Sequence, residues 1–143
     1  MHIEYAGASD RLVTLLPVRR TLRAEENRMG MTEVRVRVVN LNDARRSAEV
    51  DMVVDSGAIY SVVPAGVLRR IGVRPRDTKV FGLANGGRVT RDVGDALYEI
   101  SDCGGAAPVI FGRRGDASLL GVVTLEALGL RLDPLRRRLH PSA

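Results

Sequence analysis

Hydrophobic residues that alternate with polar ones constrain this chain more than any other feature. From Val34 to Val38, valine occupies every second position and arginine fills the positions between. A period of two is that of a β-strand with one buried face, because successive side chains point to opposite faces. Further short apolar runs follow, separated by glycine, asparagine and proline, which favour turns. The pattern predicts a fold made mainly of short strands.

One domain is predicted, with an extension before it. A length of 143 residues is typical of a single domain, and 45% hydrophobic residues are enough for one core. Aromatic residues make up 3% of the chain, so Val, Leu, Ile and Ala must form that core. Residues 32–143 carry the strand pattern and are predicted to be the domain. Residues 1–31 are predicted to be a poorly packed N-terminal extension or a pro-segment.

The charge distribution does not support a nucleic-acid partner. The formal net charge is +5, but residues 32–133 hold fourteen basic and thirteen acidic side chains and are nearly neutral. Much of the excess lies in Arg136, Arg137 and Arg138 near the C-terminus. A surface that follows a phosphate backbone needs a broad positive field, and base stacking needs aromatic side chains. We expect these arginines to form a solvated edge.

Cysteine and histidine are too few and too far apart for a structural metal site. Cys103 is the single cysteine, which excludes an intramolecular disulfide, and His2 and His140 lie at opposite ends of the sequence. The longest uncharged run, residues 56–68, is too short to span a bilayer. The N-terminus lacks the basic start and the apolar stretch of a secretory signal. These features predict a cytoplasmic protein without a membrane partner.

Turn signals divide the domain into predicted elements. Asn85-Gly86 is the strongest hairpin signal, because both residue types tolerate a positive φ. Pro64 starts a short helix that Gly72 ends, and a second helix is predicted with Thr124 as its cap and an end at Gly129. Polar turns are predicted at 40–46 and 102–105. The predicted strands are 34–38, 48–54, 61–63, 79–83, 88–100, 108–111, 119–121, 130–132 and 135–139.

An acidic residue directly follows one of the buried strands. The apolar run Met52-Val53-Val54 leads into Asp55-Ser56-Gly57, and burial of a lone carboxylate costs several kcal/mol unless something compensates. Gly57 lets the backbone turn sharply, so that amide N–H groups can face the carboxylate, and Ser56 supplies a hydroxyl. The segment therefore predicts a positioned, partly desolvated carboxylate at Asp55.

These residues resemble the retropepsin-like aspartic proteases, particularly the small single-domain bacterial and archaeal members. The family signature of two apolar residues, Asp, Thr or Ser, Gly and Ala is matched by residues 53–58. The strand and proline-initiated helix of the family are similar to residues 61–72, and its flap hairpin to residues 83–87. Its second signature, two apolar residues and Gly, is matched by residues 119–121. Four motifs in order, over roughly residues 32–139, are more specific than a lone Asp-Ser-Gly.

The resemblance implies a fold, an assembly and an activity. The fold would be all-β: a closed-barrel-like retropepsin (acid protease) subunit with one or two short helices, homodimeric. The activity would be that of an aspartic endopeptidase, a hydrolase in which a water is activated between two Asp55 residues. Two carboxyl groups about 3 Å apart share one proton, so one acts as base and the other as acid. No metal or other cofactor is implied, and the partners would be a second copy and a peptide or protein substrate.

The resemblance also implies which residues form the site. Asp55, Ser56 and Gly57 would form the catalytic loop, with Ser56 hydrogen-bonded across the dimer axis. Each copy would supply half of the site, because the chain contains one such motif. Residues beside this loop and in the flap would contact the substrate, namely Ala58, Tyr60, Ala84, Asn85, Gly86 and Gly87.

Other interpretations of the same residues stay open. A catalytically silent retropepsin-like dimer that binds or scaffolds peptides would carry the same motifs, because a fold does not by itself establish an activity. The segment Asp102-Cys103-Gly104 repeats the Asp-X-Gly order, but its neighbours favour a hairpin turn and we do not count it as a second catalytic loop. Cys103 is interpreted as an inert thiol, since no histidine lies near it in the sequence.

Overall fold

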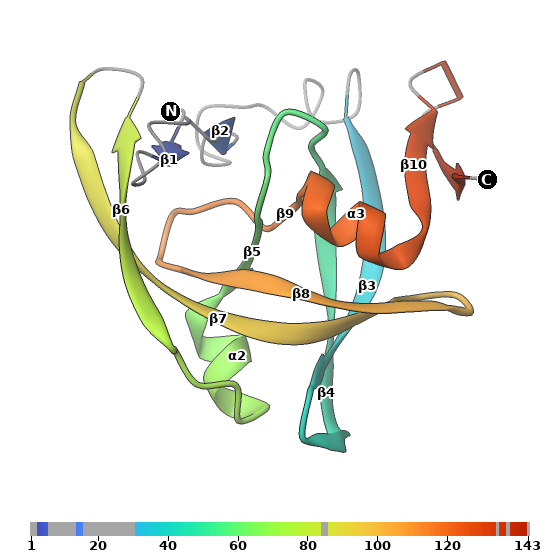
Figure 1. The fold of residues 1–143 in the computed structure, drawn as a ribbon, viewed down its shortest axis with the longest axis horizontal. Helices are drawn as coiled ribbons and strands as arrows, with labels where there is room; N and C mark the ends of the chain where they lie inside the picture. The colour runs from blue at the N-terminus through green and yellow to red at the C-terminus, as the bar shows by residue number, and fades with distance from the viewer. Residues whose placement is uncertain are drawn as a thin grey trace.

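The structure, a computed structural model, describes residues 3–5, 14–15, 31–83, 86–133, 135–136 and 138–142. Within these residues the chain is mostly β with two short helices (Figure 1), as the alternating pattern predicts. The strands are β1 (Ile3–Tyr5), β2 (Thr14–Leu15), β3 (Thr32–Asn40), β4 (Asp43–Val54), β5 (Ser61–Pro64), β6 (Asp77–Leu83), β7 (Arg88–Ile100), β8 (Cys103–Gly112), β9 (Leu119–Leu120), β10 (Leu130–Asp133) and β11 (Arg138–Pro141). The helices are α2 (Ala65–Arg70) and α3 (Val122–Leu128).

The main sheet closes on itself. Its strand order is β2-β1-β6-β7-β3-β4-β9-β5-β8, and β8 also pairs with β7. A ring is therefore formed by six strands in the spatial order β7, β3, β4, β9, β5 and β8. β6, β1 and β2 extend the sheet on the other side of β7, and β10 and β11 form a separate hairpin. The ring places the end of β4 parallel to β9. Figure 1 shows β7 and β8 crossing the middle of the molecule.

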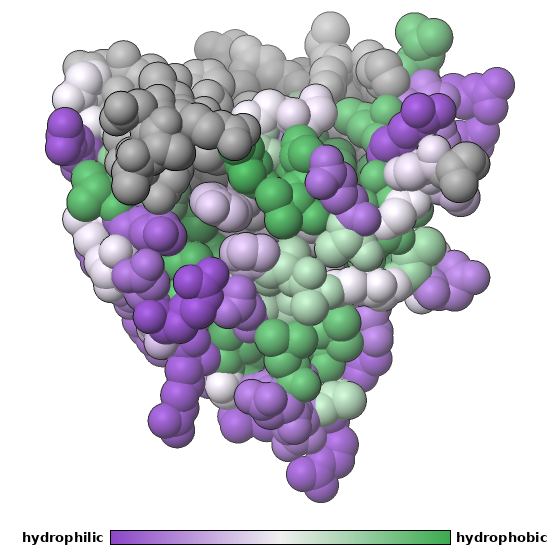
Figure 2. Space-filling view, viewed as in Figure 1, coloured by the Kyte–Doolittle hydropathy of each residue, from purple (hydrophilic) through white to green (hydrophobic). Residues whose placement is uncertain are grey.

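The core consists of two hydrophobic clusters built almost entirely from aliphatic side chains. Met52 and Val54 belong to the first cluster, and Val53 belongs to the second. The end of β4 is thus buried on both faces, which explains why its last three residues are all apolar. Each such side chain contributes about 1.5–3 kcal/mol when fully buried. On the side of the molecule shown in Figure 2, hydrophobic residues gather in the middle, and hydrophilic residues lie along the sides and the lower margin.

The predicted hairpin and the first predicted helix are confirmed. β6 and β7 pair antiparallel up to Gly82 opposite Arg88, and Gly86 has a φ of 91°, a conformation that glycine adopts at little cost. Ala84 and Asn85 lie outside the described residues. The helix α2 begins directly after Pro64, and Gly72 follows it with a φ of 81°.

Two predicted turns are shorter in the structure. β4 begins at Asp43 rather than near residue 48, because the Asn40 side-chain oxygen accepts the backbone N–H groups of Asn42 and Asp43 and closes a tight turn. β8 begins at Cys103, so the prediction of a turn at 102–105 is wrong. The turn lies at residues 101–102, where Ser101 has a φ of 53°.

Two predictions near the C-terminus are also wrong in detail. Thr124 lies inside α3, which begins after Gly121, because its hydroxyl is engaged by a buried partner instead of by the helix backbone. The last strand is β11, not 135–139. Leu135 lies in the turn before it and is 93% exposed, because the Asp133 carboxylate accepts the backbone N–H groups of Leu135 and Arg136.

Candidate active site

Asp55 lies at the end of two adjacent parallel strands. β4 pairs with β9 through Val53 opposite Leu119 and Val54 opposite Leu120. The backbone N–H of Asp55 continues this pairing by donating to the Leu120 carbonyl at 3.0 Å. The strand pairing therefore determines where the acidic residue stands.

A tight turn holds the Asp55 carboxylate. The backbone N–H of Gly57 donates to Asp55 Oδ1 at 2.8 Å, and the N–H of Ala58 donates to the Asp55 carbonyl at 3.1 Å. Asp55 is half-buried, with Oδ2 fully buried, while Ser56 and Gly57 are exposed. A Cβ added at Gly57 would lie 3.3 Å from Asp55 Oδ1, so glycine allows the close approach of this amide. The predicted catalytic loop is thus a carboxylate anchored by a backbone amide.

The loop at residues 55–60 packs directly against the start of α3. The N–H of Val122 donates to the Ala58 carbonyl at 2.8 Å, and the N–H of Val123 donates to the Ile59 carbonyl at 3.1 Å. Gly121 makes this contact possible, since a Cβ there would lie 2.6 Å from the Tyr60 carbonyl carbon. The two motifs identified in the sequence, 53–58 and 119–121, are therefore in backbone contact.

A buried polar network lies beneath this contact, and sequence analysis missed it. The Ser61 hydroxyl accepts the N–H of Gly121 at 2.9 Å and hydrogen-bonds the Thr124 hydroxyl. Ser61, Thr124 and Tyr98 are all fully buried. Burial raises the pKa of the Tyr98 hydroxyl well above its usual value, although hydrogen bonds to Ser61 and Thr124 oppose the increase. The sequence offers one signal for this network: Ser61 lies three residues after the motif at 53–58, and Thr124 lies three residues after the motif at 119–121.

The predicted substrate-contact residues are distributed unevenly. Ala58 is fully buried in the second cluster with Val62 and Phe81. Its side chain therefore packs the loop onto the core, and its role as a substrate contact stays a prediction. Tyr60 is half-buried and packs against the same cluster. Gly86 and Gly87 are exposed in the segment that joins β6 and β7. Ala84 and Asn85 lie outside the described residues.

A largely apolar hollow borders the loop that carries Asp55. Its volume is about 410 Å³, and it lies between Ser56, the start of α3 and β10. Its lining residues are Ser56, Val122, Leu125, Glu126, Leu130, Arg131, Leu132 and Ser142. The residue that directly follows Asp55 therefore faces a hydrophobic depression at the surface.

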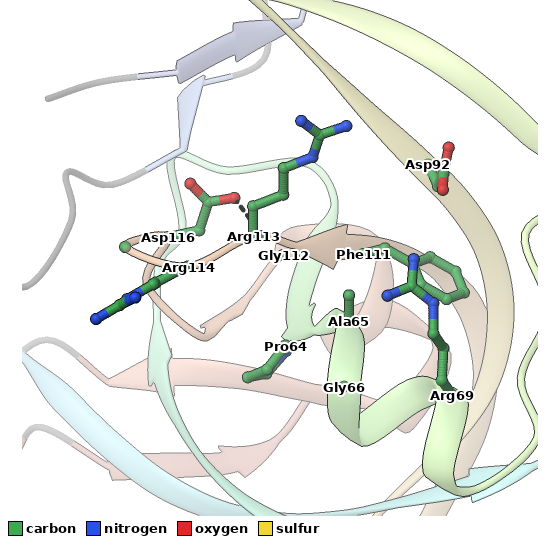
Figure 3. A pocket seen from close by; sticks show the side chains of 11 residues that line it. Pro64, Ala65, Gly66, Arg69, Asp92, Phe111, Gly112, Arg113, Arg114 and Asp116 are labelled. Atoms are coloured by element: carbon green, nitrogen blue, oxygen red, sulfur yellow. Dashed lines mark hydrogen bonds between the residues drawn. The ribbon is translucent and has the colours of Figure 1, made fainter.

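A larger cavity lies elsewhere, between α2 and the end of β8. It measures about 810 Å³ and is lined by Arg69, Arg113 and Arg114 together with Asp92 and Asp116. Figure 3 shows that the three guanidinium groups point in different directions. Asp116 accepts the backbone N–H of Arg113 at 2.8 Å. Charges of both signs that do not converge do not build an anion site.

No match is found when the sequence is compared with models of known protein families, nor when it is compared with curated proteins. Across the described ranges, no three His, Cys, Asp or Glu side chains are grouped so that they could hold a metal ion. None of the helices in the same part of the chain is long and apolar enough to cross a membrane. The geometry of the Asp55 loop is therefore the main guide to function.

Proposed function

We propose that this chain is an aspartic endopeptidase that hydrolyses peptide bonds as a homodimer of retropepsin-like subunits. The observation that carries the proposal is the Asp55 carboxylate, half-buried at the ends of two parallel strands and anchored through Oδ1 by the Gly57 amide. A fixed, partly desolvated carboxylate next to an open hollow is suited to general acid–base chemistry. The closed ring of strands supports the subunit fold.

A second copy supplies the other half of the proposed site. Peptide hydrolysis by this chemistry needs an acid and a base on either side of one water. In a twofold-symmetric dimer a residue that lies at the axis meets its own counterpart, so one Asp55 per chain is sufficient if the axis passes beside it. Ser56 is exposed beside the hollow lined by Val122 and Leu130. A depression of this apolar character is a suitable surface for the second copy to cover.

The two Asp55 carboxyl groups, about 3 Å apart, share one proton, because two carboxyl groups that close together cannot both be ionised. The ionised Asp55 takes a proton from the water as the water oxygen bonds to the peptide carbonyl carbon. The protonated carboxyl group of the second copy hydrogen-bonds the carbonyl oxygen and stabilises the charge that develops there. A proton then passes to the amide nitrogen, the C–N bond breaks, and a carboxylic acid and an amine are released.

The β6–β7 hairpin is the proposed flap. Phe81, near the end of β6, belongs to the same cluster that Tyr60 packs against. The part of the hairpin next to its connection is thus packed with the loop that carries Asp55. Gly86 and Gly87 are exposed where the two strands join. Glycines at this point allow the backbone to approach a bound peptide closely.

Mixing of subunits tests the proposal. We expect the full chain to cleave an unfolded protein such as casein and Asp55→Asn to be inactive but dimeric. In an equal mixture that has exchanged subunits, about one quarter of the dimers hold two Asp55 residues. The activity of the mixture should therefore be about one quarter of that of the parent protein at the same total protein concentration. A fall to one half would mean that each chain acts alone, and peptide that is bound but intact would indicate a silent binding dimer instead.

A further inference from the structure

The outer edge of β6 carries a strand from the N-terminal extension. β1 pairs antiparallel with β6, with Ile3 opposite Leu83, Glu4 opposite Gly82 and Tyr5 opposite Phe81. β2 pairs with the other side of β1, and Figure 1 shows this pair beside the end of β6. The pairing covers the last three residues of β6, the part next to the hairpin connection.

An uncovered edge of this kind takes up extended peptides. The other edge of β6 is already paired with β7, so without β1 the row of backbone N–H and C=O groups at residues 81–83 would be open on one side. Such a row accepts an additional strand through main-chain hydrogen bonds, with little dependence on side chains. The ligand suited to it is a peptide segment in extended conformation.

This edge is physically attached to the Asp55 loop. Phe81 is fully buried in the same cluster as Ala58, which follows the catalytic motif. Met31, at the other end of the N-terminal extension, packs against that cluster too. Figure 1 shows β1 at the same end of the molecule as the loop between β4 and β5. A strand seated on residues 81–83 therefore lies at the same end of the molecule as the loop that carries Asp55.

We propose that Ile3–Tyr5 is a self-bound strand that occupies the peptide-accepting edge of β6, so that a substrate peptide must displace it before pairing there. The N-terminal extension is then autoinhibitory. This inference rests on the proposed function, because the competing ligand is the peptide that Asp55 would hydrolyse. A pairing of three residues is short enough for competition, since a longer strand would contribute more backbone hydrogen bonds to be exchanged.

The test uses the full chain with Glu4→Pro and Tyr5→Pro combined. Proline has no backbone N–H, and two adjacent prolines block the strand whichever of the two amides faces β6. The matched control, Glu4→Ala with Tyr5→Ala, changes the same side chains but keeps both amides. Hydrogen exchange should show that protection of those amides at residues 81–83 that face β1 is reduced by about tenfold or more in the proline variant, and unchanged in the control.

A second measurement uses a fluorescent synthetic peptide with the sequence of residues 1–8. Its anisotropy should report binding at least about tenfold tighter to the proline variant than to the parent or the control, because the edge no longer has its own strand. For a cleaved peptide, the proline variant should lower KM with kcat unchanged. Equal exchange and equal peptide affinity in all three proteins would overturn the autoinhibitory strand.

The two proposals fail separately. If none of the three proteins cleaves peptides but the exchange and anisotropy differences are present, the strand occupies the edge as proposed and the hydrolase proposal is wrong. If all three cleave with the same KM, hydrolysis stands and the autoinhibitory role is wrong.

Discussion

Of the three segments of this chain with the order Asp-X-Gly, the two at 55–57 and 102–104 each lie where a strand ends or begins, and they have opposite surroundings. Asp55-Ser56-Gly57 follows a strand buried on both faces, and the Asp55 carboxylate accepts a hydrogen bond from the backbone N–H of Gly57. Asp102-Cys103-Gly104 belongs to the β7–β8 hairpin, where Asp102 is exposed in the turn. The second segment therefore belongs to a hairpin, as interpreted, although the turn itself lies at residues 101–102 and Cys103 and Gly104 are already in β8.

The difference in burial arises from how the strand before each segment is paired. In the hairpin, antiparallel pairing continues through Ile100 opposite Cys103 and Glu99 opposite Gly104, so the ladder satisfies the backbone and the carboxylate faces water. After β4, the partner strand β9 is parallel. The loop that leads on to β5 leaves this pairing and passes the start of α3, so its backbone groups need other partners. The Asp55 carboxylate accepts the N–H of Gly57, and the Ala58 carbonyl accepts the N–H of Val122. Burial of this kind, rather than the motif itself, distinguishes a candidate catalytic acid.

The largest expected effect contrasts the two aspartates. Asp55→Asn removes the ionisable pair and should lower the hydrolysis rate by on the order of 10²–10⁴-fold, the usual contribution of general acid–base catalysis. Asp102→Asn, in the exposed turn, should leave the rate within about twofold of the parent. Initial rates with casein measure both, and circular dichroism checks that each variant is folded. Similar losses in the two variants would remove the distinction between the segments.

The next contrast uses two glycines. A Cβ at Gly121 would lie 2.6 Å from the Tyr60 carbonyl carbon, whereas one at Gly104 would lie 3.8 Å from Glu99 Cγ. Gly121→Ala should therefore reduce the free energy of unfolding by about 1–3 kcal/mol, the typical cost of overpacking. Gly104→Ala should change it by less than about 1 kcal/mol. Urea unfolding measures both, and a tolerated Gly121→Ala would contradict the backbone contact described here.

Two serines extend the comparison to side chains. Ser61→Ala removes the acceptor of the Gly121 amide and the partner of Thr124, and leaving buried groups unsatisfied should cost about 1–3 kcal/mol. Ser101→Ala, at an exposed turn position, should cost no more than about 0.5 kcal/mol. The same urea experiment is the measurement. Equal stability of the two variants would show that the network does not hold the Asp55 loop.

The last contrast, which is smallest at neutral pH, concerns Tyr98. Its backbone pairs with Gly105 in the hairpin, and its hydroxyl lies in the buried network with Ser61 and Thr124. Burial raises the pKa of Tyr98 from its ordinary value of 10.0. Above about pH 10 the unfolded chain loses this proton and the folded chain keeps it, so the free energy of unfolding should fall by about 1.4 kcal/mol per pH unit.

Tyr98→Phe is the control for that pH dependence. The variant lacks the bond from the hydroxyl to the Pro108 carbonyl and should be less stable than the parent at pH 7 by about 0.5–1.5 kcal/mol. Its stability should decline less steeply between pH 10 and about pH 12, as measured by urea unfolding at each pH. Parallel curves for the two proteins would mean that Tyr98 ionises equally in both states.

Local patterns were enough to predict the class of the fold and the candidate acid. The alternation from Val34 to Val38 predicted a half-buried strand, and Gly72 and Gly86 stand at the positive-φ positions that their neighbours indicated. The apolar run before Asp55 predicted a buried strand that ends in an anchored carboxylate. These features depend on backbone conformation and on residues a few positions apart, which a single sequence displays directly.

Only the tertiary structure decided which segments meet. Closure of the ring by β7 and β8, the burial of Ala58, the contact of Ser61 with Thr124 and the pairing of Ile3–Tyr5 with β6 all join parts of the chain that are distant in sequence. A period of two identifies a strand and its buried face, but the backbone groups along its edges are nearly the same at every residue. The choice of partner therefore depends on how the whole core packs, which no local pattern contains.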